Sequence, residues 1–386
     1  MKLRLMLISV AVLATATAAL LSIYKPSSTA LENPTPSSKT DQRILRAQQS
    51  IAKLPNSADA YNQLASAYMQ KARETADFSF NAHADAAITR SLAVEPDNYD
   101  GLKLRTKLQL TYHRFAEALQ TAHHLQKFRN DDHDVWGQIT DALVELGDYP
   151  AAVKAAQTMV DLRPDSSSYA RVSYLRSLHG DTEGAIEAMT AALKASNPND
   201  PESAAWCHVQ IGNELLNSGN LADAEREFDT ALSIFPNHSL ALQGKGRARV
   251  AAGDLRGAVA IYEREPNSAD AVQALGDLYT KLGQADSAAA AFQKFDTLER
   301  ENAALERSWR HMVNFWLDHD QNLSESLRLA TTEYESRKDI FTCDSLAWAL
   351  FKNGRVAEAK KLIREALRTG SKDQRINEHA SIINQS

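Results

Sequence analysis

Apolar residues recur along this chain at helical spacing, in units of about 34 residues. The clearest unit runs from Ala205 to His238. Ile211 and Leu215 stand four residues apart in its first half, and Ala224 and Phe228 stand four apart in its second. Each half therefore predicts a helix with one apolar stripe. A pair of such helices cannot cover its own stripe, so the unit predicts a helical hairpin that stacks on neighbouring copies.

Turn residues repeat with the same period. Glycines close the first helix of most units, at Gly147, Gly180, Gly219, Gly253, Gly283 and Gly354. The successive intervals are 33, 39, 34, 30 and 71 residues, so the last spans two units, and Asp320 stands where the missing glycine is expected. Prolines end several second helices, at Pro96, Pro164 and Pro198, with Asn130 in the intervening place. Independent landmarks that share one period support the same repeat.

The repeats predict an all-α fold, a right-handed α-solenoid of stacked helix-turn-helix units. About eight or nine units fit between residues 41 and 386, and residues 374–383 are expected to form a cap helix over the last apolar face. A length of 386 residues would by itself suggest two or three globular domains. The repeat overrides that expectation, because a solenoid grows along one axis and each unit contacts only its neighbours. One elongated domain is therefore predicted.

The repeat resembles a known family. Gly212, Ala224, Phe228 and Pro236 fall as in the tetratricopeptide pattern W-x2-L-G-x2-Y, A-x3-F, P. Residues 58–383 are further similar to a family of exported bacterial tetratricopeptide-repeat (TPR) proteins, through three segments: SSYARVSYLRSLHGDTEGAIEAM, KARETADFSF with the downstream AITRSLAVEPDNYDGL, and DSLAWALFKNGRVAEAKKLIREALRTGSKD with HASII. This resemblance implies the fold and export, and no particular activity.

The N-terminal residues 1–25 differ from the rest of the chain. Lys2 and Arg4 precede a run of 19 uncharged residues, from Leu5 to Ile23. That run is long enough to span a bilayer as a helix, and it also fits a secretory signal peptide with A-x-A cleavage sites at residues 14–18. The apolar run continues past those sites, which favours an uncleaved anchor in the inner membrane. Both alternatives place the rest of the chain outside the cytoplasm, in the periplasm or secreted.

Composition adds three limits. Residues 26–40 are rich in Pro, Ser and Thr and predict a flexible linker between the membrane and the solenoid at 41–386. The net charge of −6 makes nucleic acid an unexpected partner. Cys207 and Cys343 lie on predicted first helices several units apart, so they are expected to be small buried residues and not a disulfide.

Motifs for catalysis or cofactor binding are not found in the sequence. It contains no nucleophile elbow, phosphate loop or H-E-x-x-H motif. His113, His123, His124 and His133 form the densest histidine group, but adjacent helical residues diverge by about 100°, so they do not share a face. The chain is therefore predicted to be no enzyme, with no metal and no cofactor.

The concave face of a helical solenoid is lined by the first helix of each unit and forms a groove. By their place in the repeat, ten residues are candidates for the groove and for partner binding: Lys103, Lys107, Asp141, Asn213, Gln243, Arg247, Asp277, Arg310, Asn314 and Trp348. Asn213 and Arg247 occupy equivalent places 34 residues apart, so they should be neighbours. Together they could bind a peptide carboxylate or backbone by charge-assisted hydrogen bonds.

These features favour a non-catalytic scaffold that binds a protein or peptide in the concave groove. A solvated polar surface without a ligand is the plain alternative for the groove residues. A small-molecule or glycan-binding module of the cell envelope is a second alternative, suggested by Trp348 with Asp344, and an enzyme of unrecognised type is a third. An insert around residues 71–80 carries Phe78 and Phe80, which either pack on the adjacent unit or contact something else.

Overall fold

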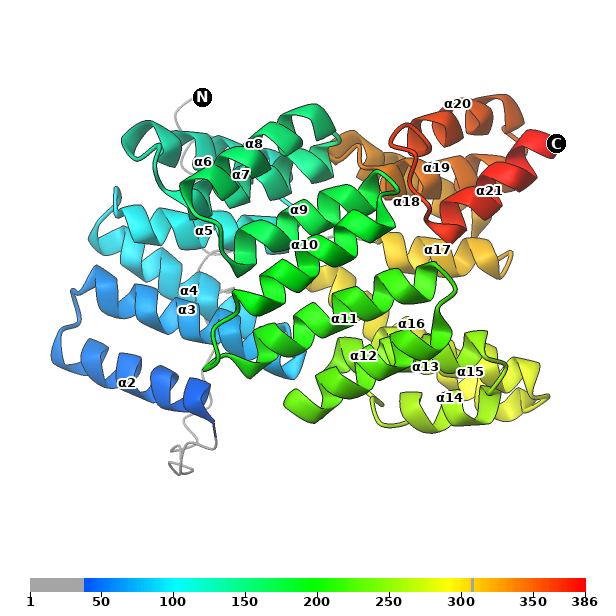
Figure 1. Cartoon of the computed structure of the whole chain (residues 1–386), viewed down its shortest axis with the longest axis horizontal. Helices are drawn as coiled ribbons and strands as arrows, with labels where there is room; N and C mark the ends of the chain where they lie inside the picture. The colour runs from blue at the N-terminus through cyan, green and yellow to red at the C-terminus, as the bar shows by residue number, and fades with distance from the viewer. Residues whose placement is uncertain (1–37, 307–308) are drawn as a thin grey trace, which may run out of the picture.

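The computed structural model describes residues 38–306 and 309–386 (Figure 1). The predicted anchor or signal and most of the linker lie outside the described residues. The described part consists of twenty helices without a strand. The helices are α2 Lys39–Lys53, α3 Ala58–Thr75, α4 Ser79–Val94, α5 Tyr99–Thr111, α6 Phe115–Phe128, α7 His133–Leu146, α8 Tyr149–Leu162, α9 Ser166–Leu178, α10 Thr182–Lys194, α11 Pro201–Asn217, α12 Leu221–Ile234, α13 Ser239–Ala251, α14 Leu255–Tyr262, α15 Ala269–Lys281, α16 Ala285–Glu306, α17 Arg310–Asp318, α18 Leu323–Ser336, α19 Ile340–Lys352, α20 Val356–Ala366 and α21 Gln374–Gln385.

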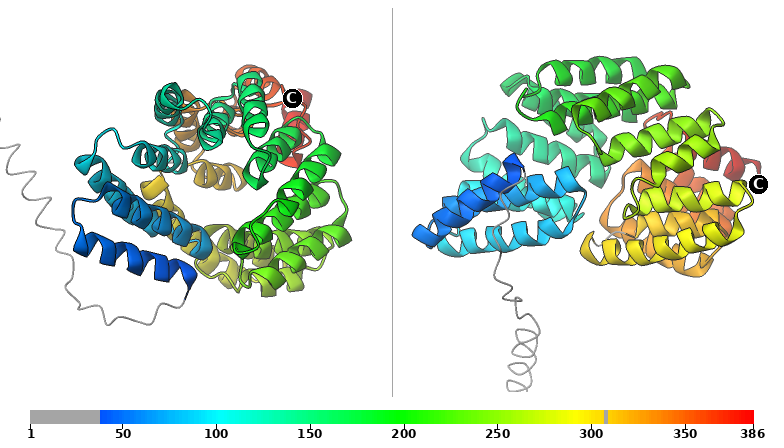
Figure 2. Two further views of the ribbon diagram at one scale, coloured as in Figure 1. Left: turned by 60° about the vertical axis from the view of Figure 1, so that its left-hand side comes forward. Right: turned by 90° about the horizontal axis from the view of Figure 1, so that it is seen from below.

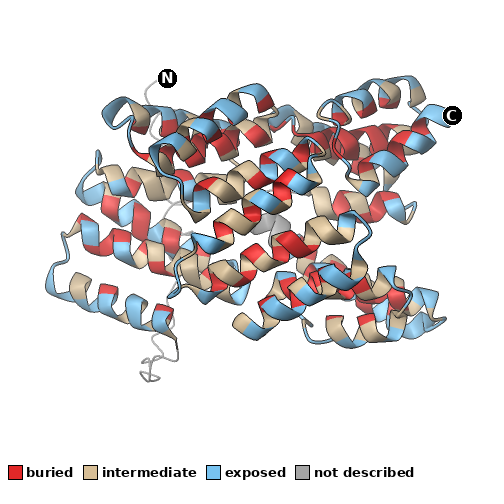
Figure 3. Ribbon diagram, viewed as in Figure 1, coloured by how far each residue is buried: buried red, intermediate tan, exposed pale blue. Residues whose placement is uncertain are grey.

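The all-α repeat solenoid is confirmed. From α3 to α20 the helices form nine successive hairpins, with α2 before them and α21 after them. Buried residues gather where hairpins face one another, and the outer faces are exposed (Figure 3). The expected closing helix is α21, which runs two residues past residue 383. Among the described helices, none is both long enough and apolar enough to cross a bilayer.

The turns follow the glycine period closely. All six glycines at the predicted turns have positive φ, between 73° and 83°. Asp320, at the missing place, has φ 54°, and so does His113, which closes α5 in a unit without a turn glycine. An unbranched polar residue can adopt this left-handed conformation at some cost in free energy, whereas glycine adopts it freely. Cys207 and Cys343 are free and buried, as expected.

Two units depart from the regular hairpin. The unit at residues 239–268 has a second helix of only eight residues, α14, as the early Pro266 predicts. In the next unit, α16 continues to Glu306 and is 22 residues long. Neither glycine nor proline interrupts that stretch, so the helix continues and leaves only nine residues for α17.

The insert near the N-terminus lengthens the first hairpin. It extends α3 to 18 residues and ends at Ala76 with φ 53°. Phe80 packs on its own hairpin, with its ring 6.2 Å from the ring of Tyr68. Phe78 remains 42% exposed at the tip. The two aromatic residues therefore have different environments, one packed and one open to solvent.

The solenoid does not extend along a single axis. It curves so far that its last hairpins return to α7–α9, as Figures 1 and 2 show. One apolar core joins Val144 and Tyr149 to Ile340 and Ile363. The expectation that each unit contacts only its neighbours is therefore wrong at this place. A small rotation added at every repeat brings units together that lie about 190 residues apart in the sequence.

Polar contacts fasten this junction, here called the seam: the α7–α8 turn at residues 145–149 against residues 337–340 and Arg368. The backbone N–H of Ile340 donates to the Tyr149 hydroxyl at 2.9 Å, and that of Lys338 donates to the Glu145 carbonyl oxygen at 3.2 Å. A Cβ atom at Gly147 would overlap the carbonyl oxygen of Lys338, so only glycine permits this close approach.

Candidate functional site

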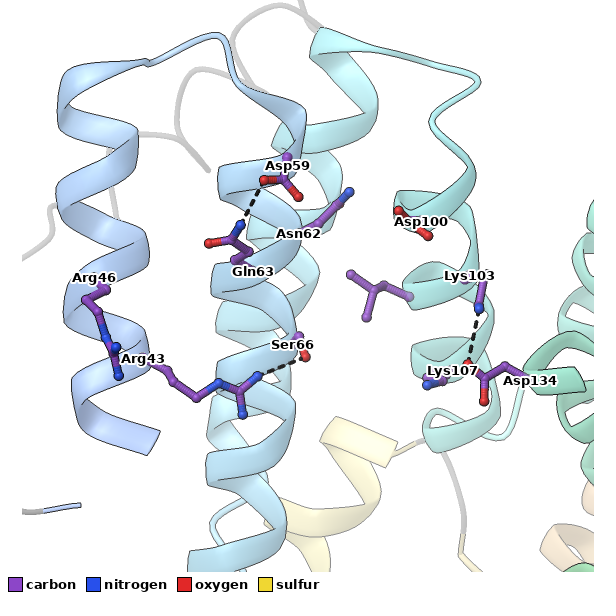
Figure 4. Close-up of a pocket in the computed structure, with 11 residues that line it drawn as sticks. Arg43, Arg46, Asp59, Asn62, Gln63, Ser66, Asp100, Lys103, Lys107 and Asp134 are labelled. Carbon is purple, nitrogen blue, oxygen red and sulfur yellow. Dashed lines mark hydrogen bonds and ion pairs between the residues drawn. The ribbon is translucent and has the colours of Figure 1, made fainter. Parts of the chain in front are cut away.

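A hollow of about 550 Å³ opens on the concave face of the first units (Figure 4). We call it the first hollow. Side chains of α2, α3, α5 and α7 line it: Arg43, Arg46, Asp59, Asn62, Gln63, Ser66, Asp100, Lys103, Leu104, Lys107 and Asp134. On α3 and α5 these residues recur every three or four positions, so each helix presents one face to the hollow. The helical period therefore explains why these side chains converge.

Lys103 is held by carboxylates at the edge of the first hollow. Its ammonium lies 2.8 Å from Asp132 Oδ2 and 3.1 Å from Asp134 Oδ2. Burial alone would lower the pKa of Lys103, but these two carboxylates outweigh it and raise the pKa above its usual value. Lys103 is therefore a structural ion-pair partner, and its charge is already neutralised.

The same carboxylates belong to the cluster Asp132, His133 and Asp134, whose potential ligand atoms lie within 4.8 Å of one another. Lys103 supplies the positive charge that a metal ion would bring to this cluster. His133 Nε2 lies 3.2 Å from Asp165, and an Asp132 oxygen accepts the N–H of Asp134 as a helix cap. The cluster is thus occupied by protein contacts, and we assign no metal to it.

Three other cations in the first hollow make no ion pair among the described residues. Arg43 donates only a long hydrogen bond of 3.5 Å to Ser66, and Arg46 donates to the carbonyl oxygen of Gln42 in its own helix. Lys107 is exposed within the hollow, with protein on most sides. Desolvation by the surrounding protein lowers the pKa of Lys107, and the positive charges of Lys103 and Arg171 add to this effect, although the nearby Asp134 carboxylate opposes it. These cations are available to a ligand.

A second hollow, of about 190 Å³, lies further along α5 and α7. Its lining is Leu110, Phe115, Thr140, Asp141, Val144, Glu145, Arg171, Tyr174 and Leu175. The charges at its edge are paired, because Arg171 contacts Asp141 at 2.6 Å and Glu145 contacts Arg337 of the seam. The rest of the wall is mostly apolar.

The ten sequence-predicted residues fall into several groups. Lys103 and Lys107 line the first hollow, and Asp141 lines the second. Asn213 and Arg247 are neighbours as predicted, since the guanidinium of Arg247 donates to Asn213 Oδ1 at 2.8 Å. They lie on α11 and α13, outside both hollows.

Four more candidates are engaged in contacts within the protein. Gln243 is buried and donates to Ser239 and Ser268. Asp277 contacts His319 at 3.1 Å, Asn314 accepts a hydrogen bond from Ser345 at 2.9 Å, and Arg310 lies 3.5 Å from Asp339. These side chains support the packing of neighbouring helices.

The assignment of Trp348 to the groove is wrong. Trp348 is only 8% exposed, and its ring stacks on His379 of α21 at 4.2 Å. Asp344 is also buried, and it contacts His379 Nδ1 at 2.9 Å. The closing helix covers the last unit, so a residue that would line the groove in an internal unit belongs to the core here.

Residues of α2 and α3 also line the first hollow, although they were not among the candidates predicted from the sequence. Asn62, Gln63 and Ser66 have the helical spacing of a groove face, which is a usable signal. The insert after α3 adds residues to the first unit and shifts the 34-residue register. Positions equivalent to the groove residues of later units therefore do not fall on Asn62, Gln63 and Ser66. Arg43 and Arg46 lie on α2, which precedes the first hairpin that the structure describes.

Comparisons with known proteins agree with the repeat architecture. Models of the tetratricopeptide repeat match residues 140–201, 209–271, 269–302 and 342–371. No curated protein matches this chain. Similar solved structures include the APC/C hetero-tetramer Cut9–Hcn1, with 15% identity and a TM-score of 0.52, over 88% of this chain and 59% of that chain. The human IFIT1 dimer with m7Gppp-AAAA has 15% identity and a TM-score of 0.55, over 85% of this chain and 76% of that chain.

At this level of identity the structural similarity concerns the fold. The class is an α-helical repeat solenoid. Within that class the chain is a tetratricopeptide-repeat protein, since family models match several of its units. This chain spans less than two thirds of the length of the Cut9–Hcn1 chain. The resemblance to an exported bacterial family remains a prediction.

Proposed function

We propose that this protein is a non-catalytic scaffold that binds a protein or peptide partner in the concave groove of its superhelix. The observation that carries this proposal is the first hollow. Arg43, Arg46 and Lys107 project into it without an ion pair among the described residues. Charged side chains usually form hydrogen bonds or remain fully solvated. Here three cationic side chains converge on a concave surface, which is the kind of surface where ligands bind.

The stacked-hairpin architecture favours partner binding because its surface is already formed. Stacked hairpins form a rigid surface before the partner arrives, so the loss of conformational entropy falls mainly on the partner. Repeat proteins of this kind use their curved inner face for extended contacts. The glycan-binding alternative loses its basis, because Trp348 and Asp344 lie under α21. We do not propose an enzymatic activity.

The location is a second part of the proposal. Residues 5–23 tether the protein to the inner membrane, with the solenoid on the extracytoplasmic side. A flexible linker of the composition and length of residues 26–40 spans on average about 20 Å, so the groove would stay close to the membrane surface. Protease treatment of intact spheroplasts tests this. Digestion of the solenoid supports the location, and protection until the cells are lysed contradicts it.

Capture of partners from cells tests the binding groove. The full-length protein is cross-linked in cells and purified beside an Arg43→Glu, Lys107→Glu double variant. Lys154→Glu is the matched control, because Lys154 is an exposed cation on α8 outside both hollows. A partner recovered with the native protein and the control but lost with the double variant supports the proposal. Equal recovery from all three contradicts the use of this groove.

A third variant examines Asn213 and Arg247, the polar pair that the repeat pattern predicts to line the groove. Arg247→Glu with Asn213→Ala breaks the contact between α11 and α13. If the partner extends along the whole groove, this variant weakens capture as well. If the first hollow is sufficient, capture stays at the native level.

A further inference from the structure

The two hollows lie along the same two helices, α5 and α7. On α5, Lys103, Lys107 and Leu110 stand at positions i, i+4 and i+7, which lie on one face of a helix. On α7, Asp134 lines the first hollow and Asp141 lines the second. Seven residues of helix correspond to about 10 Å. A single bound segment can therefore reach both hollows.

The first hollow is polarised along its length. Asp59 and Asp100 lie in the first turns of α3 and α5, at one end (Figure 4). Arg43 and Lys107 lie toward the opposite end, where Arg43 reaches across α3. That end is the one closer to Leu110 of the second hollow. Lys107 and Arg43 thus lie at the end of the first hollow nearer the second, together with the Asp134 carboxylate that pairs with Lys103.

The second hollow suits an apolar side chain. Leu110, Phe115, Val144 and Leu175 contribute to its wall, and Tyr174, which also lines it, is 45% exposed. A volume of 190 Å³ is enough for one large side chain, since an apolar cavity of about 150 Å³ can hold a benzene molecule. The charged side chains at its edge, Arg171 and Glu145, already form ion pairs within the protein, so a charged group on the ligand is not required there.

Resting on the proposed function, we infer that the partner contributes an extended peptide segment with an acidic side chain at Lys107 and a bulky apolar side chain in the second hollow. The two side chains stand three residues apart. A polyproline II segment rises about 3.1 Å per residue with three residues per turn, so residues i and i+3 point the same way about 9 Å apart. This is close to the rise of about 10 Å between Asp134 and Asp141, the residues of α7 that line the two hollows.

Peptide binding to the full chain in detergent micelles tests the inference. The probes are fluorescent Gly/Ser peptides that carry one Asp and one Leu at separations from one to five residues, in both orders. In one of the two orders, the peptide with a separation of three is expected to bind on the order of tenfold more tightly than its Asn or Ser counterparts. Equal affinity at all separations, or no binding up to about millimolar concentration, overturns it.

Variants assign the two ends of the peptide. Lys107→Glu should weaken binding of the Asp and Leu peptide and improve binding of a Lys and Leu peptide of the same separation. Tyr174→Ala should remove the preference for Leu over Ser and keep the preference for Asp. Lys154→Glu should change neither. Unchanged preferences in Lys107→Glu and Tyr174→Ala would overturn the assignment of the hollows.

This test and the capture experiment fail separately. If cells yield a partner that depends on Arg43 and Lys107 but no peptide shows the predicted spacing, the scaffold proposal stands and the inferred partner chemistry is wrong. If peptides bind as predicted and no such partner is captured from cells, the peptide site stands and the cellular scaffold proposal is wrong.

Discussion

Charged residues cluster in two regions of this molecule, and the regions use them differently. At the seam Arg337 is 4% exposed and contacts three carboxylates, those of Glu145, Glu333 and Asp339. In the first hollow Lys107 is exposed and has no ion pair among the described residues. A buried charge needs partners to offset its desolvation, whereas an open charge can remain unpaired. The seam is structural, and the first hollow is available for binding.

Removal of Arg337 should have the largest effect on stability. Arg337→Met removes the cation that Glu145 contacts at the seam and leaves Asp339 with Arg310 alone, and breaking a buried pair in this way costs about 3–5 kcal/mol. Urea unfolding of both proteins measures the loss. Arg300→Met is the control, because Arg300 pairs with Asp296 on the exposed face of α16 and should cost less than about 1 kcal/mol. Equal losses would contradict a structural role for the seam.

Substitution of two turn glycines, Gly147 at the seam and Gly253 in an ordinary turn, compares the two kinds of turn. Gly253 has φ 80° with open space around it, so Gly253→Ala should cost about 1–2 kcal/mol for the left-handed backbone alone. Gly147 has the same φ, but its Cβ would overlap the Lys338 carbonyl oxygen. Gly147→Ala should therefore cost clearly more than Gly253→Ala. Thermal unfolding compares the two, and similar melting temperatures would show that the contact is unimportant.

Acid should weaken the seam through His113. Burial, and then the charges of Arg337 and Arg310, lower the pKa of His113 to about 4. The unfolded chain, with a pKa near 6.5, binds the proton more readily, so stability should fall by about 2–3 kcal/mol as the pH drops from about 6.5 to 4. Urea unfolding at several pH values measures this fall.

His113→Asn is the matched variant for that experiment. Asparagine does not titrate, and it tolerates the left-handed conformation at this turn. Its stability should change less than that of the native protein over the same pH range. Below about pH 4 both proteins should lose further stability as Asp339 is protonated, because the Arg337 and Arg310 guanidiniums outweigh burial and hold the pKa of that carboxyl below its usual value.

Loss of charge in the first hollow should have the smallest effect on stability. The pKa of Lys107 is lowered by burial and neighbouring cations, so its charged form is disfavoured in the folded protein. Lys107→Met should therefore leave the free energy of unfolding within about 0.5 kcal/mol of the native value, or raise it. The same variant should lose partner binding. A large loss of stability would show that Lys107 has a structural role.

Much of the fold could be predicted from the sequence, because each hairpin depends on local patterns. The apolar spacing and the turn residues predict the hairpins, and Asp320 has the left-handed φ expected from its place in the period. The seam could not be predicted in this way. Glu145 and Arg337 lie 192 residues apart, and their contact depends on small rotations summed over several units.

The candidate site was predictable only in part. Repeat position identified Lys103, Lys107 and Asp141 on the walls of the hollows. Repeat position could not show that carboxylates neutralise Lys103, because Asp132 and Asp134 stand at the start of α7, and this contact depends on how that helix packs on α5. It failed for Trp348, since the pattern of an internal unit does not reveal that α21 covers the last one.

Site-specific photo-cross-linking tests the central claim most directly. A photoreactive phenylalanine analogue replaces Gln63, which is exposed in the first hollow, or Lys154 on α8, in the full-length protein in cells. We predict a discrete cross-linked partner from position 63 that Lys107→Glu abolishes, and none from position 154. Cross-links from position 154 alone, or from position 63 at the same level after Lys107→Glu, would contradict the claim that the first hollow is the binding site.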